Sequence, residues 1–159
     1  MKQTAIEDRA QAQMQPGVIT RDGMLGTDTR RLVDILVEDE AAVRRLGTTN
    51  ITIARRMRQL RRAGAGGLGN SIPVGDNFDV IVDGVRGRLP CPYEDGTVSK
   101  TNTRVFNRRL GRELLFTDLN IHLIERHGFY MGRGSLYRIE PADAMAILEI
   151  EPDPPPTIP

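Results

Sequence analysis

The sequence predicts an α+β fold, and three observations favour it. Apolar residues recur at helical spacing between residues 27 and 62. Short apolar runs bounded by turn residues, which are typical of strands, follow between residues 78 and 116. Helical patterns return towards the C-terminal end. The 159 residues are 39% hydrophobic but only 4% aromatic, so we expect one modest core built mainly from aliphatic side chains.

The N-terminal segment 1–26 is expected to be an arm. Residues 5–14 predict one short helix, and Pro16-Gly17 and Asp22-Gly23 after it favour turns. The segment lacks the apolar stretch of a secretory signal, and no run in the sequence approaches the roughly 18 apolar residues that span a bilayer. A single cysteine, Cys91, cannot form an internal disulfide, which is typical of a cytoplasmic protein.

Three helices are predicted after the arm, over residues 32–38, 41–46 and 50–62. Asp39-Glu40 is expected to end the first helix and begin the second, where carboxylates complement the helix dipole. Gly47 should end the second helix, because glycine readily adopts the left-handed conformation that stops a helix. Thr49 or Asn50 is the expected N-cap of the third.

The second half of the sequence predicts two hairpins. The first joins residues 78–82 to 85–89 through Asp83-Gly84, a dipeptide that favours a type I′ turn. The second joins residues 104–106 to 113–116. The remaining expected elements are a helix over 119–127 stopped by Gly128, a short strand over 136–139, a helix over 142–148 and an extended proline-rich tail over 151–159.

The most distinctive segment is basic. Seven arginines and no acidic residue lie between Arg44 and Arg62, in a chain whose formal net charge is +1. Over residues 50–62 the apolar side chains share one helix face, and most of the arginines fall outside it. Such a concentration of positive charge favours a polyanionic partner such as nucleic acid.

These residues resemble the winged helix-turn-helix family. The three predicted helices correspond to its helical core, the hairpin at 78–89 to its wing, and Gly47 to the left-handed turn of the motif at 42–64. The resemblance implies a winged-helix-like domain at 27–89. A mixed β-α portion at 90–150 follows it, and the arm at 1–26 and the tail at 151–159 flank the two.

The resemblance also implies a set of DNA-binding residues. A recognition helix places its N-terminal residues against base edges, while later cations hold phosphates. Asn50 and Arg55 would accordingly contact bases, and Thr52 shares their outward face. The expected phosphate contacts are Arg44, Arg45, Arg56, Arg58 and Arg62.

We therefore expect a non-enzymatic protein that binds double-stranded DNA without a cofactor, such as a small transcriptional regulator of bacterial or phage origin. Three other roles stay open. The basic helix could instead be solvated or docked on an acidic protein. The sequence is net basic at 44–62 and 86–138 and net acidic at 1–43, 63–85 and 139–159. This alternation, the polar arm and the tail also suit an assembly subunit of a virion or other large particle, a homo-oligomer whose arms are ordered by neighbouring copies. A small enzyme built on residues 116–138 is the third.

Candidate chemistry is otherwise sparse. His122 and His127 are the only histidines, and their i, i+5 spacing places them about 140° apart on a helix, whereas two ligands on one helix face need i, i+3 or i+4. Cys91 lies between Pro90 and Pro92, a setting typical of an inert, half-buried side chain. We therefore expect no catalytic and no metal-binding residues.

Overall fold

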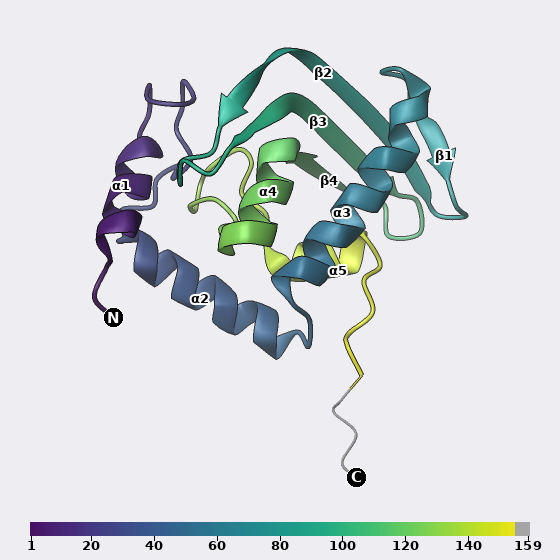
Figure 1. The fold of residues 1–159 in the computed structure, drawn as a ribbon. Helices are drawn as coiled ribbons and strands as arrows, with labels where there is room; N and C mark the ends of the chain where they lie inside the picture. Colours follow the sequence, from purple (N-terminus) through teal and green to yellow (C-terminus); the bar gives the residue numbers. More distant parts are fainter. Residues whose placement is uncertain (155–159) are drawn as a thin grey trace.

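The structure of the protein, a computed structural model, describes residues 1–154, so residues 155–159 of the predicted tail lie outside it. Its helices are α1 (Ala5–Gln13), α2 (Leu32–Arg45), α3 (Asn50–Gly64), α4 (Asp118–His127) and α5 (Pro141–Ile147), with a short 3-10 helix, η1 (Ala65–Gly67), after α3. Its strands are β1 (Ile72–Val74), β2 (Phe78–Pro90), β3 (Thr97–Asn107) and β4 (Arg112–Thr117). The predicted α+β class is confirmed (Figure 1).

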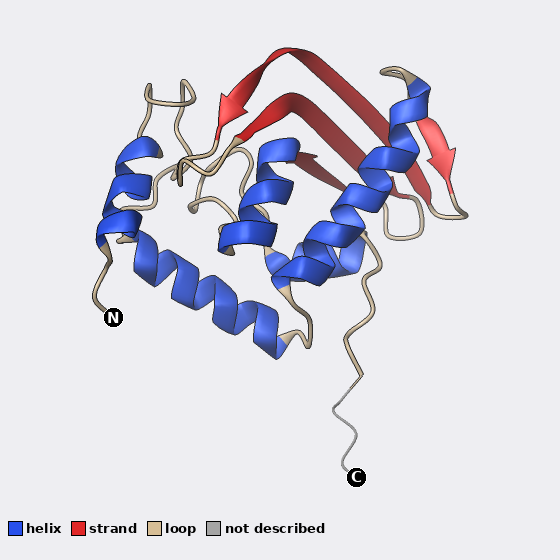
Figure 2. Ribbon diagram, in the orientation of Figure 1, coloured by secondary structure: helices blue, strands red, loops and turns tan. Residues whose placement is uncertain are grey.

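The four strands form one antiparallel sheet in the order β1-β2-β3-β4. Its longest pairing runs from Phe78 opposite Asn107 to Pro90 opposite Thr97, and a bulge after Val85 interrupts it. Strands β2 and β3 arch over α3 and α4, while α1 and α2 lie further from the sheet (Figure 2). The sheet therefore covers one side of a helical layer.

Helix α4 lies between two apolar cores. Its Ile121 and Ile124 pack in the first core, with residues of α3, α5 and the sheet. Its Leu119 and Leu123 pack in the second, with residues of α1 and the start of α2. The predicted arm contributes to this second core, because Met14, directly after α1, is fully buried there.

The first turn of α2 is capped by side chains from the N-terminal segment. Its N-cap residue, Arg31, makes no side-chain capping bond. Instead, Gln11 Oε1 accepts a hydrogen bond from Leu32 N (3.0 Å), and Gln3 Oε1 accepts one from Val33 N (2.9 Å). These bonds satisfy amides that every helix leaves without a partner at its start.

One helix, α2, replaces the two that were predicted over 32–38 and 41–46. No glycine or proline lies between residues 32 and 46, and acidic residues do not break a helix by themselves. Asp39 instead faces the interior, where its carboxylate accepts two hydrogen bonds from Arg138 (2.7 and 2.8 Å). The predicted break is wrong, and a winged-helix arrangement is not confirmed.

The hairpin predicted within residues 78–89 is also wrong. Asp83 and Gly84 stay extended and pair with Asn102 and Thr101 of β3, so the chain turns at residues 91–96 instead. Along this stretch β2 pairs with β3, which is rich in threonine and valine, residue types that favour strands.

Most other predicted elements are confirmed. Helices α1, α3, α4 and α5 match their predicted ranges to within two residues at each end, and β3 and β4 contain the predicted second hairpin. Gly47 has a φ of +75°, the left-handed conformation expected of it. The strand predicted over 136–139 is wrong, because this segment turns and lies outside the sheet.

A buried carboxylate joins the chain before α2 to the segment after α4. The Asp28 side chain is only 2% exposed. It accepts hydrogen bonds from the Arg30 guanidinium (2.8 and 2.9 Å) and from Arg133 N (3.2 Å). The bonds from Arg30 outweigh the effect of burial and hold the pKa of Asp28 well below its usual range.

We expect Asp28→Asn to lower the free energy of unfolding by about 1.5–3 kcal/mol at neutral pH, the typical value of hydrogen bonds to a charged group. Because the pKa is depressed in the folded state, this stability is present above the unfolded pKa of about 3.9 and is lost as the pH falls through the folded value. Urea unfolding of both proteins at about pH 7 and about pH 3 tests this. The prediction is wrong if the free energies of unfolding of wild type and Asp28→Asn differ by the same amount at both pH values.

Candidate functional site

Two arginines of the basic segment are held by carboxylates of α4. Arg58 donates to both oxygens of Glu125 (2.7 and 3.2 Å), and Arg61 donates to both oxygens of Asp118 (2.7 and 3.1 Å). The Arg58 guanidinium lowers the pKa of Glu125, in keeping with an ionised pair. These two ion pairs tie α3 to α4, so two of the seven arginines at 44–62 are neutralised within the fold, and one of them, Arg58, is a predicted phosphate contact.

A third arginine, Arg56, also makes contacts within the protein. Its Nε donates to the Leu148 carbonyl oxygen (2.9 Å), and its guanidinium lies 5.3 Å from the centroid of the Phe78 ring. A cation over an aromatic face is attracted to it. Arg56 therefore links α3 to β2 and to the end of α5.

The two polar residues predicted at the start of α3 have local partners. Asn50 Oδ1 accepts a hydrogen bond from the hydroxyl of Tyr130, which is fully buried (2.7 Å). Thr52 Oγ1 accepts one from the Thr49 hydroxyl (3.0 Å), next to the capping bond that Thr49 accepts from Thr52 N (3.1 Å). The Asn50 side chain is thus directed towards the protein's own interior residue Tyr130.

The other four predicted residues, all arginines, are exposed. Arg44 pairs with Glu40 (2.8 Å) but keeps 78% of its side chain exposed. Within residues 1–154, no carboxylate lies within 4.0 Å of Arg45, Arg55 or Arg62. Arg55 and Arg62 are seven residues apart and share one face of α3, with a rise of about 10.5 Å between them. This outward face is the basic surface that the fold leaves open.

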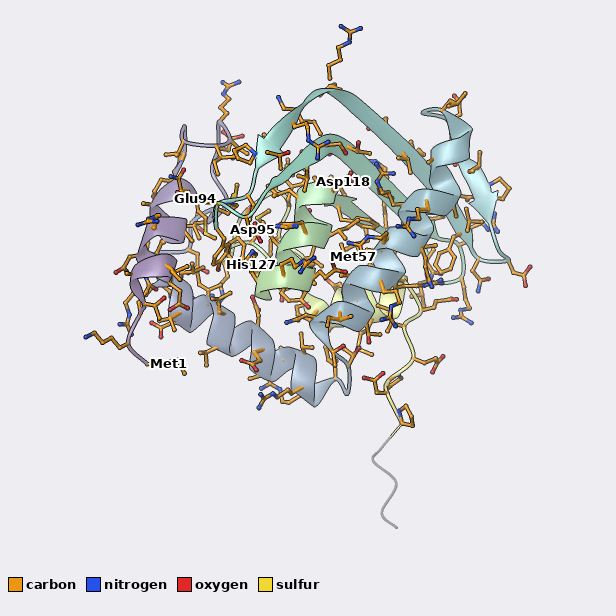
Figure 3. The ribbon with its side chains drawn as sticks, in the orientation of Figure 1. Met1, Met57, Glu94, Asp95, Asp118 and His127 are labelled. Carbon is orange, nitrogen blue, oxygen red and sulfur yellow. The ribbon has the colours of Figure 1, made fainter. Side chains whose placement is uncertain are left out.

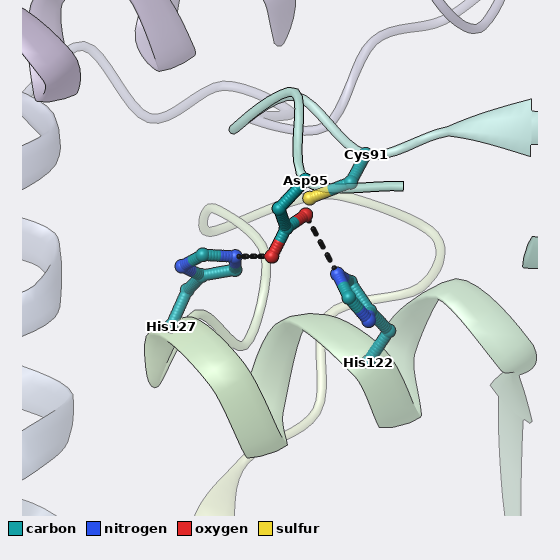
Figure 4. A group of neighbouring side chains, drawn as sticks. All are labelled: Cys91, Asp95, His122 and His127. Carbon is teal, nitrogen blue, oxygen red and sulfur yellow. Dashed lines mark hydrogen bonds and ion pairs between the residues drawn. The ribbon is translucent and has the colours of Figure 1, made fainter. Parts of the chain in front are cut away.

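A second cluster lies between the β2–β3 connection and α4. The Nε2 atoms of His122 and His127 are 2.9 and 2.8 Å from the two carboxylate oxygens of Asp95, which sits above the helix between them (Figure 4). The Cys91 side chain completes the group, and one potential ligand atom from each of the four residues lies within 4.8 Å of the others. In Figure 3, Asp95 and His127 lie together beside α4, away from Asp118 at its start.

Neighbouring groups hold this cluster in place. The Tyr93 ring stacks on His127, with centroids 3.8 Å apart and planes 7° from parallel. Cys91 Sγ accepts a hydrogen bond from Tyr93 N (3.4 Å), and Cys91 N donates to the Gly96 carbonyl oxygen (2.9 Å), which closes the turn. The four side chains therefore converge from a tight turn and from the last two turns of one helix.

The charges of the cluster are set by burial and by its own hydrogen bonds. Burial disfavours the ionised form of Asp95, but hydrogen bonds from Cys91, His122 and His127 outweigh it and hold the pKa of this carboxyl below its usual range. Burial, followed by the hydrogen bond to Asp95, raises the pKa of the Cys91 thiol to about 12. Burial also lowers the pKa of His127.

A cavity of about 810 Å³ lies elsewhere, between the bend of the sheet and segment 19–26. Its lining includes Asp83, Lys100 and Tyr137. Neither the four residues of the Cys91 cluster nor any of the eight residues predicted to bind DNA lines it. The two candidate sites are therefore a surface and a side-chain cluster outside this cavity.

Sequence reasoning missed the cluster because it treated the two histidines as ligands on one helix face. The partner group lies above the helix, so side chains about 140° apart can both turn towards it. One signal was present: the chain holds one cysteine and two histidines, and all three lie in this cluster.

Comparisons with protein-family models, curated proteins and solved structures gave no match. Among the helices of residues 1–154, none combines the length and the apolar character needed to cross a membrane.

Proposed function

We propose that this protein is a non-enzymatic DNA-binding protein that contacts duplex phosphates through the exposed arginines of α2 and α3. The observation that carries the proposal is the open face of α3, where Arg55 and Arg62 extend into solvent without a carboxylate partner in the described chain. Arg44 and Arg45 at the end of α2 add two exposed cations on the other side of the Gly47 turn.

The ion pairs of α3 refine the expected contacts. Since Arg58 is bound to Glu125, and Asn50 is bound by Tyr130, neither is the best placed to meet DNA. Arg55, near the start of α3, is the best placed for a base contact, and Arg44, Arg45 and Arg62 for phosphates. Phosphate contacts supply most of non-specific affinity, so binding should depend strongly on salt.

The test is fluorescence anisotropy with a labelled duplex of random sequence at about 50 and 200 mM salt. On a duplex of random sequence Arg55 is expected to contact a phosphate as the other three arginines do, and four such contacts predict a loss of affinity of about 100-fold between these salt concentrations. Arg55→Ala/Arg62→Ala should reduce the magnitude of the slope of log affinity against log salt by about two.

A matched control removes the same charge elsewhere. Arg9 and Arg21 are exposed and lie in the N-terminal segment, so Arg9→Ala/Arg21→Ala has the same net charge as the α3 variant. It should leave the salt slope unchanged. If wild type fails to bind at the lower salt, or if both double variants behave alike, the proposal is wrong. A concentration-dependent oligomer seen by light scattering would then favour a role for these arginines in contacts between two copies of the chain.

A further inference from the structure

We propose that Cys91, Asp95, His122 and His127 bind one Zn²⁺ ion, which fastens the β2–β3 connection to α4. The chain contains one cysteine and two histidines, and the fold brings all three to one carboxylate. Cys91 and Asp95 come from the turn between two strands, whereas both histidines come from α4. An ion held by all four would therefore cross-link two elements that are about 30 residues apart in the sequence.

The donor set fits zinc. Protein zinc sites take thiolate, imidazole and carboxylate ligands in tetrahedral groups of four, with bonds of about 2.0–2.3 Å. Such bonds place ligand atoms about 3.3–3.8 Å apart. The four potential ligand atoms lie within 4.8 Å of one another, and the Asp95 oxygens are 2.8 and 2.9 Å from the imidazole nitrogens. A central ion thus requires shifts of about 1 Å or less.

Calcium and magnesium fit this set less well. Both ions prefer shells made of oxygen ligands, whereas three of these four donors are sulfur or nitrogen. Four protein ligands also fill a tetrahedral shell and leave no open position for a substrate. The geometry therefore favours a closed, structural site over a catalytic one.

The surroundings of the cluster support ligation. The Tyr93 ring stacks on His127 and fixes the plane of the imidazole. The Tyr93 amide donates to Cys91 Sγ, a bond that stabilises a thiolate ligand. Partners of this kind orient the ligands of metal sites and are as much a part of those sites as the ligands themselves.

A cysteine nucleophile is the main alternative, and the contacts disfavour it. An activated thiol needs a base that accepts its proton. Within residues 1–154 no hydrogen bond joins Cys91 Sγ to either imidazole; the sulfur accepts one from Tyr93 N, and the Nε2 atoms of both histidines contact Asp95. The Cys91 side chain is also buried, whereas reactive cysteines lie in partially exposed settings that a substrate can reach.

The experiment titrates the purified full chain, freed of metal with a chelator, with Co²⁺ and then with Zn²⁺. One equivalent of Co²⁺ should produce the intense visible bands of a tetrahedral ion and a near-ultraviolet band from thiolate ligation. Zn²⁺ should abolish both bands by displacement. This measurement uses the wild-type protein and does not depend on any variant folding.

Variants then assign the ligands. Cys91→Ser and Asp95→Asn should each weaken Zn²⁺ binding by at least about 100-fold, since even loss of a partner outside the ligand shell costs 10–100-fold. Glu94→Gln is the matched control, because Glu94 is an exposed carboxylate in the same turn and lies outside the cluster. It should bind Zn²⁺ as wild type does. Zn²⁺ in slight molar excess should raise the unfolding temperature of wild type and Glu94→Gln by more than that of Cys91→Ser.

Three results would contradict the proposed Zn²⁺ site. The first is a weak octahedral cobalt spectrum without a thiolate band. The second is equal Zn²⁺ affinity in wild type and Cys91→Ser. The third is the same loss of affinity in Glu94→Gln as in Asp95→Asn. None of these results bears on DNA binding by α3, because the two sites share no residue.

Discussion

Arg138→Met is expected to lower the free energy of unfolding by about 3–5 kcal/mol. Arg138 is 12% exposed and makes paired hydrogen bonds to Asp39 of α2, whose side chain is 6% exposed. It also donates to the Met131 carbonyl oxygen (2.9 Å). Removing the guanidinium would leave a buried carboxylate without its counter-ion, which costs more than the intact pair contributes.

Urea unfolding at neutral pH measures this effect, and two further variants isolate its cause. Arg104→Met is the control, because Arg104 pairs with Glu113 on the surface and such pairs contribute about 1 kcal/mol or less. Asp39→Leu/Arg138→Met removes both charges, and it should recover much of the stability that the single variant loses. If Arg138→Met and Arg104→Met lower the free energy of unfolding equally, the buried pair contributes no more to stability than the surface pair, and the prediction is wrong.

Gly132→Ala should lower the free energy of unfolding by about 3 kcal/mol, the upper end of the usual range for overpacking. Gly132 N donates to the Met24 carbonyl oxygen (2.9 Å), so two segments more than 100 residues apart run against each other here. An added Cβ would overlap the Leu25 carbonyl oxygen and lie 2.6 Å from Leu25 Cα. Because the obstacle is backbone, no side chain can rotate away to make room.

Thermal unfolding of Gly132→Ala and of Gly66→Ala tests this steric argument. Gly66 is exposed, and an added Cβ would meet no heavy atom within 4 Å. Gly66→Ala should therefore be neutral or stabilise the protein by up to about 1 kcal/mol. A similar unfolding temperature for the two variants would mean that the contact at Gly132 relaxes without cost.

Local signals predicted most of the helices, because a helix depends on spacing and caps within about 15 residues. Thr49 and Gly128, for example, cap α3 and α4 at the predicted positions. The split of α2 was wrong since the role of Asp39 depends on Arg138, which lies 99 residues further along the chain. The hairpin at 78–89 was wrong because the choice of a strand partner is a property of the whole sheet.

The candidate sites were harder to predict than the elements that carry them. The arginine content of α3 is visible in the sequence, but which cations stay exposed depends on Glu125 and Asp118, 67 and 57 residues away from their partners. The cluster at Cys91 depends on a turn that places Asp95 over α4, and the spacing of the histidines alone argued against it. Only its composition gave a local hint.

The glutamine caps of α2 carry a consequence for sequence variation. Because Gln11 supplies a bond that Arg31, the N-cap residue, does not, positions 11 and 31 are not independent. A homologous chain without Gln11 would satisfy the same helix start most directly with Ser, Thr or Asp at position 31. These two positions should therefore change together during evolution, although they are 20 residues apart and only one of the two side chains bonds to the helix start.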